Sequence, residues 1–147
     1  GAIKAFLDHL AYRWMPHRPA HEMFGKRAVV ITQCLGLGAK SASRDIKHSL
    51  SWWEISKIGT FTTSLLGDIA WEKLPAKKQA KLTKQLQHLA KKFARIDYTK
   101  PAHTSLITKL KFLARSMIQK IIHKSHPESL DRRYWAEQGW LDGNRPW

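Results

Sequence analysis

The sequence contains little cysteine and no long apolar run, and these two absences exclude several classes of protein. Cys34 is the only cysteine among 147 residues, so an intramolecular disulfide and a cysteine-rich metal site are excluded. A single thiol is typical of a reducing compartment, and we expect a cytoplasmic location. No stretch reaches the ~18 consecutive apolar residues of a membrane-spanning helix, and no secretory signal peptide is visible.

Acidic residues are also scarce, because 11 Asp and Glu stand against 26 Lys and Arg, which gives a formal net charge of +15. A balance this basic favours contact with phosphate-bearing cofactors, nucleic acid or an anionic membrane. The eight histidines are scattered, and no group of His, Asp and Glu has the spacing of a zinc site. We therefore expect no metal, and no Ser/His/Asp set for nucleophilic catalysis can be singled out.

The stretch over residues 26–43 is the most informative part of the chain. Residues 28–31 are apolar and rich in β-branched side chains, which predicts a strand buried on both faces that ends at Thr32. A loop of small residues with Gly36 and Gly38 follows. α/β proteins use a strand, a glycine loop and a helix N-terminus to hold an anionic or planar ligand. The alternative is an ordinary turn that needs glycine for its backbone angles.

The segments around this loop alternate between helix and strand patterns. Ser43 is placed to cap a helix over residues 44–51, and β-branched and aromatic residues predict a second strand over 57–63. Two strands joined through a helix form a βαβ unit, in which the strands are parallel. The spacing of apolar residues before this unit predicts another helix over 2–14.

Two long helices are predicted after the second strand. Gly67 and Asp68 interrupt the strand pattern, and residues 69–74 are expected to form a loop or a single turn. Pro75 is placed to open a lysine-rich helix whose apolar seam consists of Leu82, Leu86, Leu89, Phe93 and Ile96. The next helix, over 104–123, has a seam that consists of Leu106, Leu110, Leu113, Met117 and Ile121.

Tryptophan is abundant, with seven in the chain, and it gathers in two places. Trp52 and Trp53 follow the helix after the glycine loop, where one is expected to pack under the sheet or to lie near a planar ligand. Pro127 interrupts the helical pattern before an aromatic-rich tail. Trp135 and Trp140 are expected to anchor this tail to the rest of the protein.

Three known loop motifs fail to match the glycine loop. A GxGxxG dinucleotide loop needs a small residue at position 41, where Ser41 stands, but the acid that would bind a ribose downstream is unclear. A Walker A loop needs Gly directly before Lys, whereas Ala39 precedes Lys40. A phosphatase loop with Cys34 as nucleophile needs Arg where Lys40 stands, and lysine lacks the bidentate fork of guanidinium.

The segments GAIKAFLDHLAYRW, GKRAVVITQCLGLGAKSA, KIGTF and DRRYWAEQGWL, in this order, resemble the flavodoxin-like NAD(P)H-dependent FMN reductases. Gly1, Lys4 and Asp8 match the visible part of that family's Ser-Gly-x-x-Lys-x-x-x-Asp helix start. Gly25-Lys26 matches the usual beginning of its fourth strand. The tail with Tyr134-Trp135 and Gly139-Trp140 is similar to that of one branch of the family.

The resemblance implies an α/β fold, the C-terminal part of a flavodoxin-like three-layer, doubly wound parallel sheet with extra C-terminal helices. Residues 1–100 would belong to the flavodoxin-like domain, and residues 101–147 would be a helical extension packed on it. In the strand order 2-1-3-4-5 only the fourth and fifth strands would be present, and the phosphate-binding loop would precede residue 1. Because two strands are too few to stand alone, either an upstream half or another chain covers the sheet edge, or the chain repacks into a mainly helical body.

The implied function is that of a flavoprotein oxidoreductase with FMN and NAD(P)H as cofactors, and homodimers are common in the family. Thr32, Gln33, Gly36 and Gly38 would position the flavin ring, and Lys40 would offset negative charge on the reduced flavin. No catalytic side chain is required, because the cofactor carries the reactivity. The alternative from another class is a basic, helix-rich module that binds nucleic acid or an anionic membrane.

Overall fold

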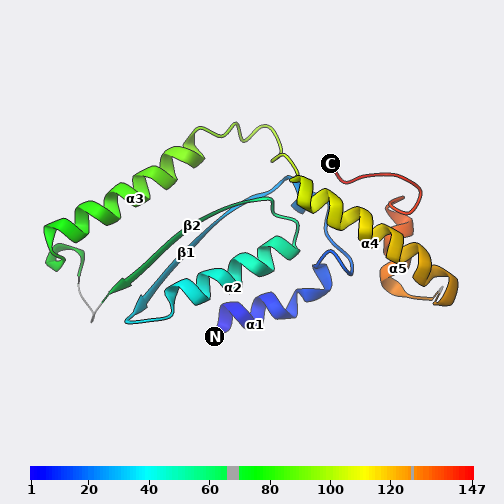
Figure 1. Ribbon diagram of the computed structural model, residues 1–147, viewed down its shortest axis with the longest axis horizontal. Helices are drawn as coiled ribbons and strands as arrows, with labels where there is room; N and C mark the ends of the chain where they lie inside the picture. Colours follow the sequence, from blue (N-terminus) through cyan, green and yellow to red (C-terminus); the bar gives the residue numbers. More distant parts are fainter. Residues whose placement is uncertain (66–69, 127) are drawn as a thin grey trace. The chain divides into compact units, whose positions relative to one another are not determined.

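The computed structural model describes residues 1–65, 70–126 and 128–147 and shows an α/β chain with a two-stranded parallel sheet (Figure 1). The helices and strands are α1 (Ala2–His9), β1 (Arg27–Leu35), α2 (Ala39–Trp52), β2 (Lys57–Leu65), α3 (Ala76–Ala94), α4 (Leu106–Ser125) and α5 (Leu130–Glu137). Short 3₁₀ helices cover Ala11–Arg13, His21–Gly25 and Trp71–Lys73. The predicted breaks at Gly67, Asp68 and Pro127 lie outside the described residues.

The chain forms two compact units. The first unit contains residues 1–27, 49–57 and 101–147, and the second contains residues 28–48 and 58–100. The second unit holds most of the sheet and α3, whereas the first unit holds α1, α4 and α5.

The predicted parallel βαβ arrangement is confirmed, but β1 differs from its prediction in length and burial. The strand continues to Leu35 instead of ending at Thr32. Just beyond the end of the strand, the Gly36 N–H donates to the Leu65 carbonyl at 2.8 Å. Pairing with β2 therefore extends past the apolar run over residues 28–31. The strand is not buried on both faces, because Val30 is buried while its neighbour Ile31 is exposed.

Helix α2 begins at Ala39 and not at residue 44, so the prediction that Ser43 is its N-cap is wrong. Ser43 is buried within the second turn. The Gly38 carbonyl accepts the N–H of Ala42 at 3.0 Å, which is the first bond of the helix. Two glycines with positive φ turn the chain within three residues, and this leaves no room for a longer loop.

Helix α3 begins directly after Pro75, as predicted. It packs on β2 so closely that a Cβ atom at Gly59 would lie 2.7 Å from the Phe93 ring and 2.8 Å from Leu89. Leu65, Leu74 and Leu82, with Phe61 against them, form the small core of the second unit. Leu86, a member of the predicted seam, is partly exposed, so the seam is only buried in places.

An aromatic core fills the first unit. Its buried members are Met15, Phe24, Phe112, Trp135, Trp140 and Leu141. Trp135 and Trp140 are almost fully buried, which confirms that they anchor the tail. The predicted helix over residues 2–14 is shorter, because α1 ends at His9 and only Leu7 of its apolar stripe is buried.

Helix α4 buries the side opposite to its apolar seam, which the pattern indicated as the buried side. The five seam residues from Leu106 to Ile121 are exposed, and the buried side carries Phe112, Ser116 and Gln119. Phe112 stacks on Trp135 at 4.9 Å between ring centroids and meets Trp140 edge-on at 5.3 Å. Burial of these large rings decides the orientation of the helix, since each aromatic side chain removes ~150–250 Å² from water.

Candidate functional site

The loop between β1 and α2 leaves its backbone open. Gly36 has a φ of +80° and Gly38 a φ of +112°, values that side chains other than glycine rarely adopt. A Cβ atom at either position would meet nothing within 4 Å. Leu37 between them is 97% exposed. In the described part of the chain the N–H groups of Leu37 and Gly38 donate to no acceptor, so both are free for a ligand.

The predicted site residues fall into two groups. Gly36 and Gly38 form the loop and Lys40 lies in the first turn of α2, whereas Thr32 and Gln33 lie within β1. The hydroxyl of Thr32 donates to the Ala39 carbonyl at 3.1 Å, so Thr32 supports the first residue of α2. Gln33 is exposed on the same face of the strand as Ile31 and Leu35, and nothing in the described residues brings it to the loop.

Cys34 is a strand residue that links the two strands. Its Sγ lies 3.2 Å from the Ser64 Oγ on β2 and 3.5 Å from the Gly36 carbonyl, to which the thiol donates. These contacts give the thiol a structural role. Among the residues that the structure describes, no three His, Cys, Asp or Glu side chains gather closely enough to hold a metal ion.

A basic cavity of about 690 Å³ lies at the carboxyl end of β2. Lys40 reaches it from the first turn of α2, and Lys77, Lys78 and Lys81 reach it from the first turns of α3. The lining also includes three consecutive hydroxyl residues of β2, namely Thr62, Thr63 and Ser64. Anions are favoured at such a place because ammonium groups, hydroxyls and the N-terminal ends of two helices face it together.

The charges of this cavity are largely uncompensated. Lys78 donates to the Ser64 carbonyl at 3.2 Å. No ion pair joins Lys40, Lys77 or Lys81 to a carboxylate within the described ranges. A second hollow of about 680 Å³ lies further along α3, shares Thr62, Lys81 and Gln85 with the first, and is also lined by Lys84, His88 and Lys92. The surface along this side of α3 is therefore a continuous basic groove.

From the sequence, the lysines of α3 were expected either to bind nucleic acid or an anionic membrane or to form a solvated face, and this cavity was not predicted. One signal was available, because a helix that follows the second strand of a parallel βαβ unit begins at the edge that carries the glycine loop. Lysines in the first turns of that helix must lie near Lys40, which stands in the first turn of α2.

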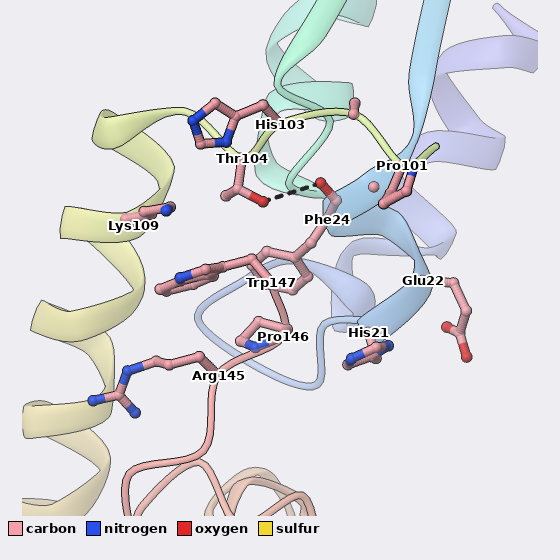
Figure 2. Close-up of a pocket in the computed structure, with 12 residues that line it drawn as sticks. His21, Glu22, Phe24, Pro101, His103, Thr104, Lys109, Arg145, Pro146 and Trp147 are labelled. Atoms are coloured by element: carbon pink, nitrogen blue, oxygen red, sulfur yellow. Dashed lines mark hydrogen bonds between the residues drawn. The ribbon is translucent and has the colours of Figure 1, made fainter. Parts of the chain in front are cut away.

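The first unit has its own cavity of about 730 Å³, which Figure 2 shows. Lys109 and Arg145 lie near the Trp147 ring, and His21 and Glu22 lie on the opposite side of the cavity. The Lys109 Nζ is 5.3 Å from the centre of the Trp147 ring. The lining combines apolar residues with the polar side chains of His21, Glu22, His103, Lys109 and Arg145, and the hydroxyl of Thr104 donates to the Phe24 carbonyl at 3.3 Å.

Two other sequence predictions can be placed in the first unit. Trp52 stacks on Trp14 with ring centroids 6.1 Å apart, and the Lys111 ammonium lies 5.0 Å from its ring centre. The Trp52 ring therefore already has two protein partners. Lys4 and Asp8, matched to the helix start of the flavin family, form an exposed ion pair of 2.9 Å.

Comparison of the chain with protein-family models, with curated proteins and with solved structures found no match.

Proposed function

We propose that this chain supplies the carboxyl-edge loops of a flavodoxin-like, FMN-dependent NAD(P)H oxidoreductase. The observation that carries the proposal is the loop over residues 36–38, where two positive-φ glycines expose bare backbone beside a parallel strand pair. A flat ring can lie against Gly36 and Gly38 because neither carries a side chain, with the exposed Leu37 side chain beside it, and the N–H groups of Leu37 and Gly38 can donate to its carbonyl oxygens.

The uncovered side of β1 supports the three-layer, doubly wound arrangement. Among the described residues β1 pairs only with β2, and Val29, Ile31 and Leu35 are exposed along one of its faces. A strand with so much apolar surface is expected to lie in the middle of a larger sheet. In the proposed fold, further strands pair with β1 and a helix covers this face.

The basic cavity supports an anionic cofactor. FMN and NAD(P)H both carry phosphate groups, and Lys40, Lys77 and Lys81 would attract them without competition from an acidic partner. Lys40 would also stabilise negative charge on a reduced ring, and Thr32 would hold the loop in place through Ala39. When bound, FMN takes up hydride from the nicotinamide and passes the electrons to an acceptor.

The decisive measurement is the colour of the protein encoded by the whole gene. We expect it to be yellow and to release FMN when it is denatured. We expect residues 1–147 alone to bind FMN weakly, since they contain no counterpart of the Ser/Thr-rich phosphate loop of the family. A colourless whole protein that binds DNA with a steep dependence on salt would instead support the basic-module alternative.

Gly38→Val in the whole protein tests the loop itself, and Gly143→Val is its matched control. Both glycines have a φ of +112° and open space around the missing Cβ, so both substitutions place a β-branched residue at a φ value that only glycine readily adopts. Only Gly38 lies in the proposed flavin loop. We expect Gly38→Val to lower the FMN content at least tenfold and Gly143→Val to leave it unchanged. Equal FMN content in the two variants would contradict the proposed role of the loop.

A further inference from the structure

Helix α4 carries a long apolar strip that the first unit does not cover. The strip consists of Leu106, Leu110, Leu113, Met117 and Ile121, with Ile107 and Ile118 beside them. The exposed fraction of these side chains runs from 38% to 71%. Residues at this spacing lie in adjacent rows on one side of a helix, so the strip runs along most of α4. Exposed apolar surface of this extent marks an interaction site.

The back of α4 is fastened to the first unit. Phe112 is fully buried among the rings of the aromatic core. The Ser116 hydroxyl donates to the Trp140 carbonyl at 3.0 Å, and the Gln119 side-chain amide donates to the Pro16 carbonyl at 3.2 Å. These contacts hold the helix by its polar and aromatic side, so the apolar strip faces outward along its whole length and cannot turn inward.

Basic side chains border the strip on both sides. Lys109 and Lys120 are three turns apart on one border, and Lys111 lies on the other. The ammonium groups of Lys109 and Lys111 lie over the rings of Trp147 and Trp52, as Figure 2 shows for Lys109. Helix α4 contains no Asp or Glu, so its two borders are purely basic.

This distribution of charge distinguishes between possible occupants of the strip. A second copy of the chain would bring basic border against basic border in any pairing of the two α4 helices, with no carboxylate on either helix to compensate. Nucleic acid would contact the lysines but would leave the apolar centre without a partner. An anionic bilayer satisfies both features, because acyl chains take up the apolar strip and headgroup phosphates face the lysines.

We propose that α4 lies in the headgroup–acyl boundary of an anionic membrane, parallel to its surface. No helix in the described part of the chain is both long and apolar enough to cross a bilayer, so the contact is with one leaflet. The long stems of Lys109, Lys111 and Lys120 allow their charged ends to reach the phosphates while the strip is immersed. This surface belongs to the first unit and does not depend on the flavin proposal.

A dye on the strip tests the depth of the contact. The single cysteine makes this simple, since Cys34→Ser removes the natural thiol and Met117→Cys places a new one on the strip. A polarity-sensitive dye at this site should brighten severalfold with vesicles of phosphatidylcholine and phosphatidylserine, and little with phosphatidylcholine alone. The same dye at Lys91→Cys on α3 is the control and should stay unchanged. No change at position 117 would overturn the proposal.

Charge variants of the full chain then separate the borders of α4 from the net charge. Lys109→Gln with Lys120→Gln should lower the vesicle partition coefficient about thirtyfold. Lys47→Gln on α2 with Lys91→Gln on α3 removes the same net charge and should lower it less than threefold. Equal losses would show that α4 is not the contact. Sedimentation of Met117→Gln tests the second copy, because conversion of a stable dimer to a monomer would assign the strip to self-association.

Discussion

Replacement of Glu54 by Gln should stabilise the chain at neutral and alkaline pH. Glu54 lies between α2 and β2 with a φ of +70°, and only 1% of its surface is exposed. Its Oε1 has no hydrogen-bond partner in the described part of the chain. Burial raises the pKa of this carboxyl group from 4.5 to about 9, although the Lys111 charge and a hydrogen bond with the Met15 backbone both act to lower it.

The sign of the effect follows from the protons that each state binds. The unfolded chain loses the Glu54 proton near pH 4.5, whereas the folded chain keeps it to about pH 9. Between these values the folded state binds more protons, so the free energy of unfolding falls as the pH rises. One pKa unit corresponds to about 1.4 kcal/mol, so this group should lower the free energy of unfolding by about 4 kcal/mol between about pH 5 and pH 8.

Glu54→Gln keeps the side-chain length and the backbone conformation but cannot ionise. Its added N–H group costs ~1–3 kcal/mol if no acceptor is found, so the variant should be less stable than the wild type near pH 5. At pH 8 it should be more stable by about 2 kcal/mol, because the larger ionisation cost is gone. Urea unfolding followed by tryptophan fluorescence at several pH values measures both differences.

At each pH, the free energy of unfolding of Glu54→Gln is compared with that of the wild type. The titration of all other groups contributes equally to both values and is removed by the subtraction. Glu137→Gln on α5 is the control, since that carboxylate is exposed and its difference from the wild type should stay within about 0.5 kcal/mol at every pH. If the wild type and Glu54→Gln lose stability in parallel from pH 5 to pH 8, the carboxyl group is ionised in the folded chain. The reasoning from burial would then be refuted, and pairing with Lys111 would be the dominant interaction.

Two further substitutions test the packing and capping of single elements. Gly59→Ala should lower the free energy of unfolding by about 1–3 kcal/mol, because its Cβ would meet the Phe93 ring at 2.7 Å; a neutral result in a denaturant titration would show that α3 is not pressed against β2. Ser105→Ala should cost about 1 kcal/mol, since the Ser105 hydroxyl accepts the Thr108 N–H at the start of α4; the same titration with Ser105→Asp, which restores an acceptor, should recover most of the loss.

The elements that local patterns specify were predictable. β-branched residues mark β2, and Pro75 marks the first turn of α3 because proline has no N–H to lose there. The turn at Gly36 and Gly38 was also predictable, since only glycine adopts the φ values found there without strain, although the loop is shorter than predicted.

The boundaries next to the loop were not predictable from the pattern. The apolar run ends near Thr32, but strands are extended by hydrogen bonds to a neighbour, and β2 supplies such bonds as far as Gly36. Ser43 has the side chain of a helix cap, yet the helix starts earlier because Gly38 already provides the first carbonyl acceptor.

The sequence by itself determined the types of the elements, the position of the open loop and the excess of positive charge, because each depends on neighbours within a few turns. Only the tertiary structure decided which side of α4 is buried, which lysines meet Lys40 in one cavity, and that Glu54 is enclosed. These outcomes depend on contacts such as that of Phe112 with Trp135, between residues far apart in the chain. The spacing of apolar residues predicts a helix, but it does not predict which face of the helix packs against the rest of the protein.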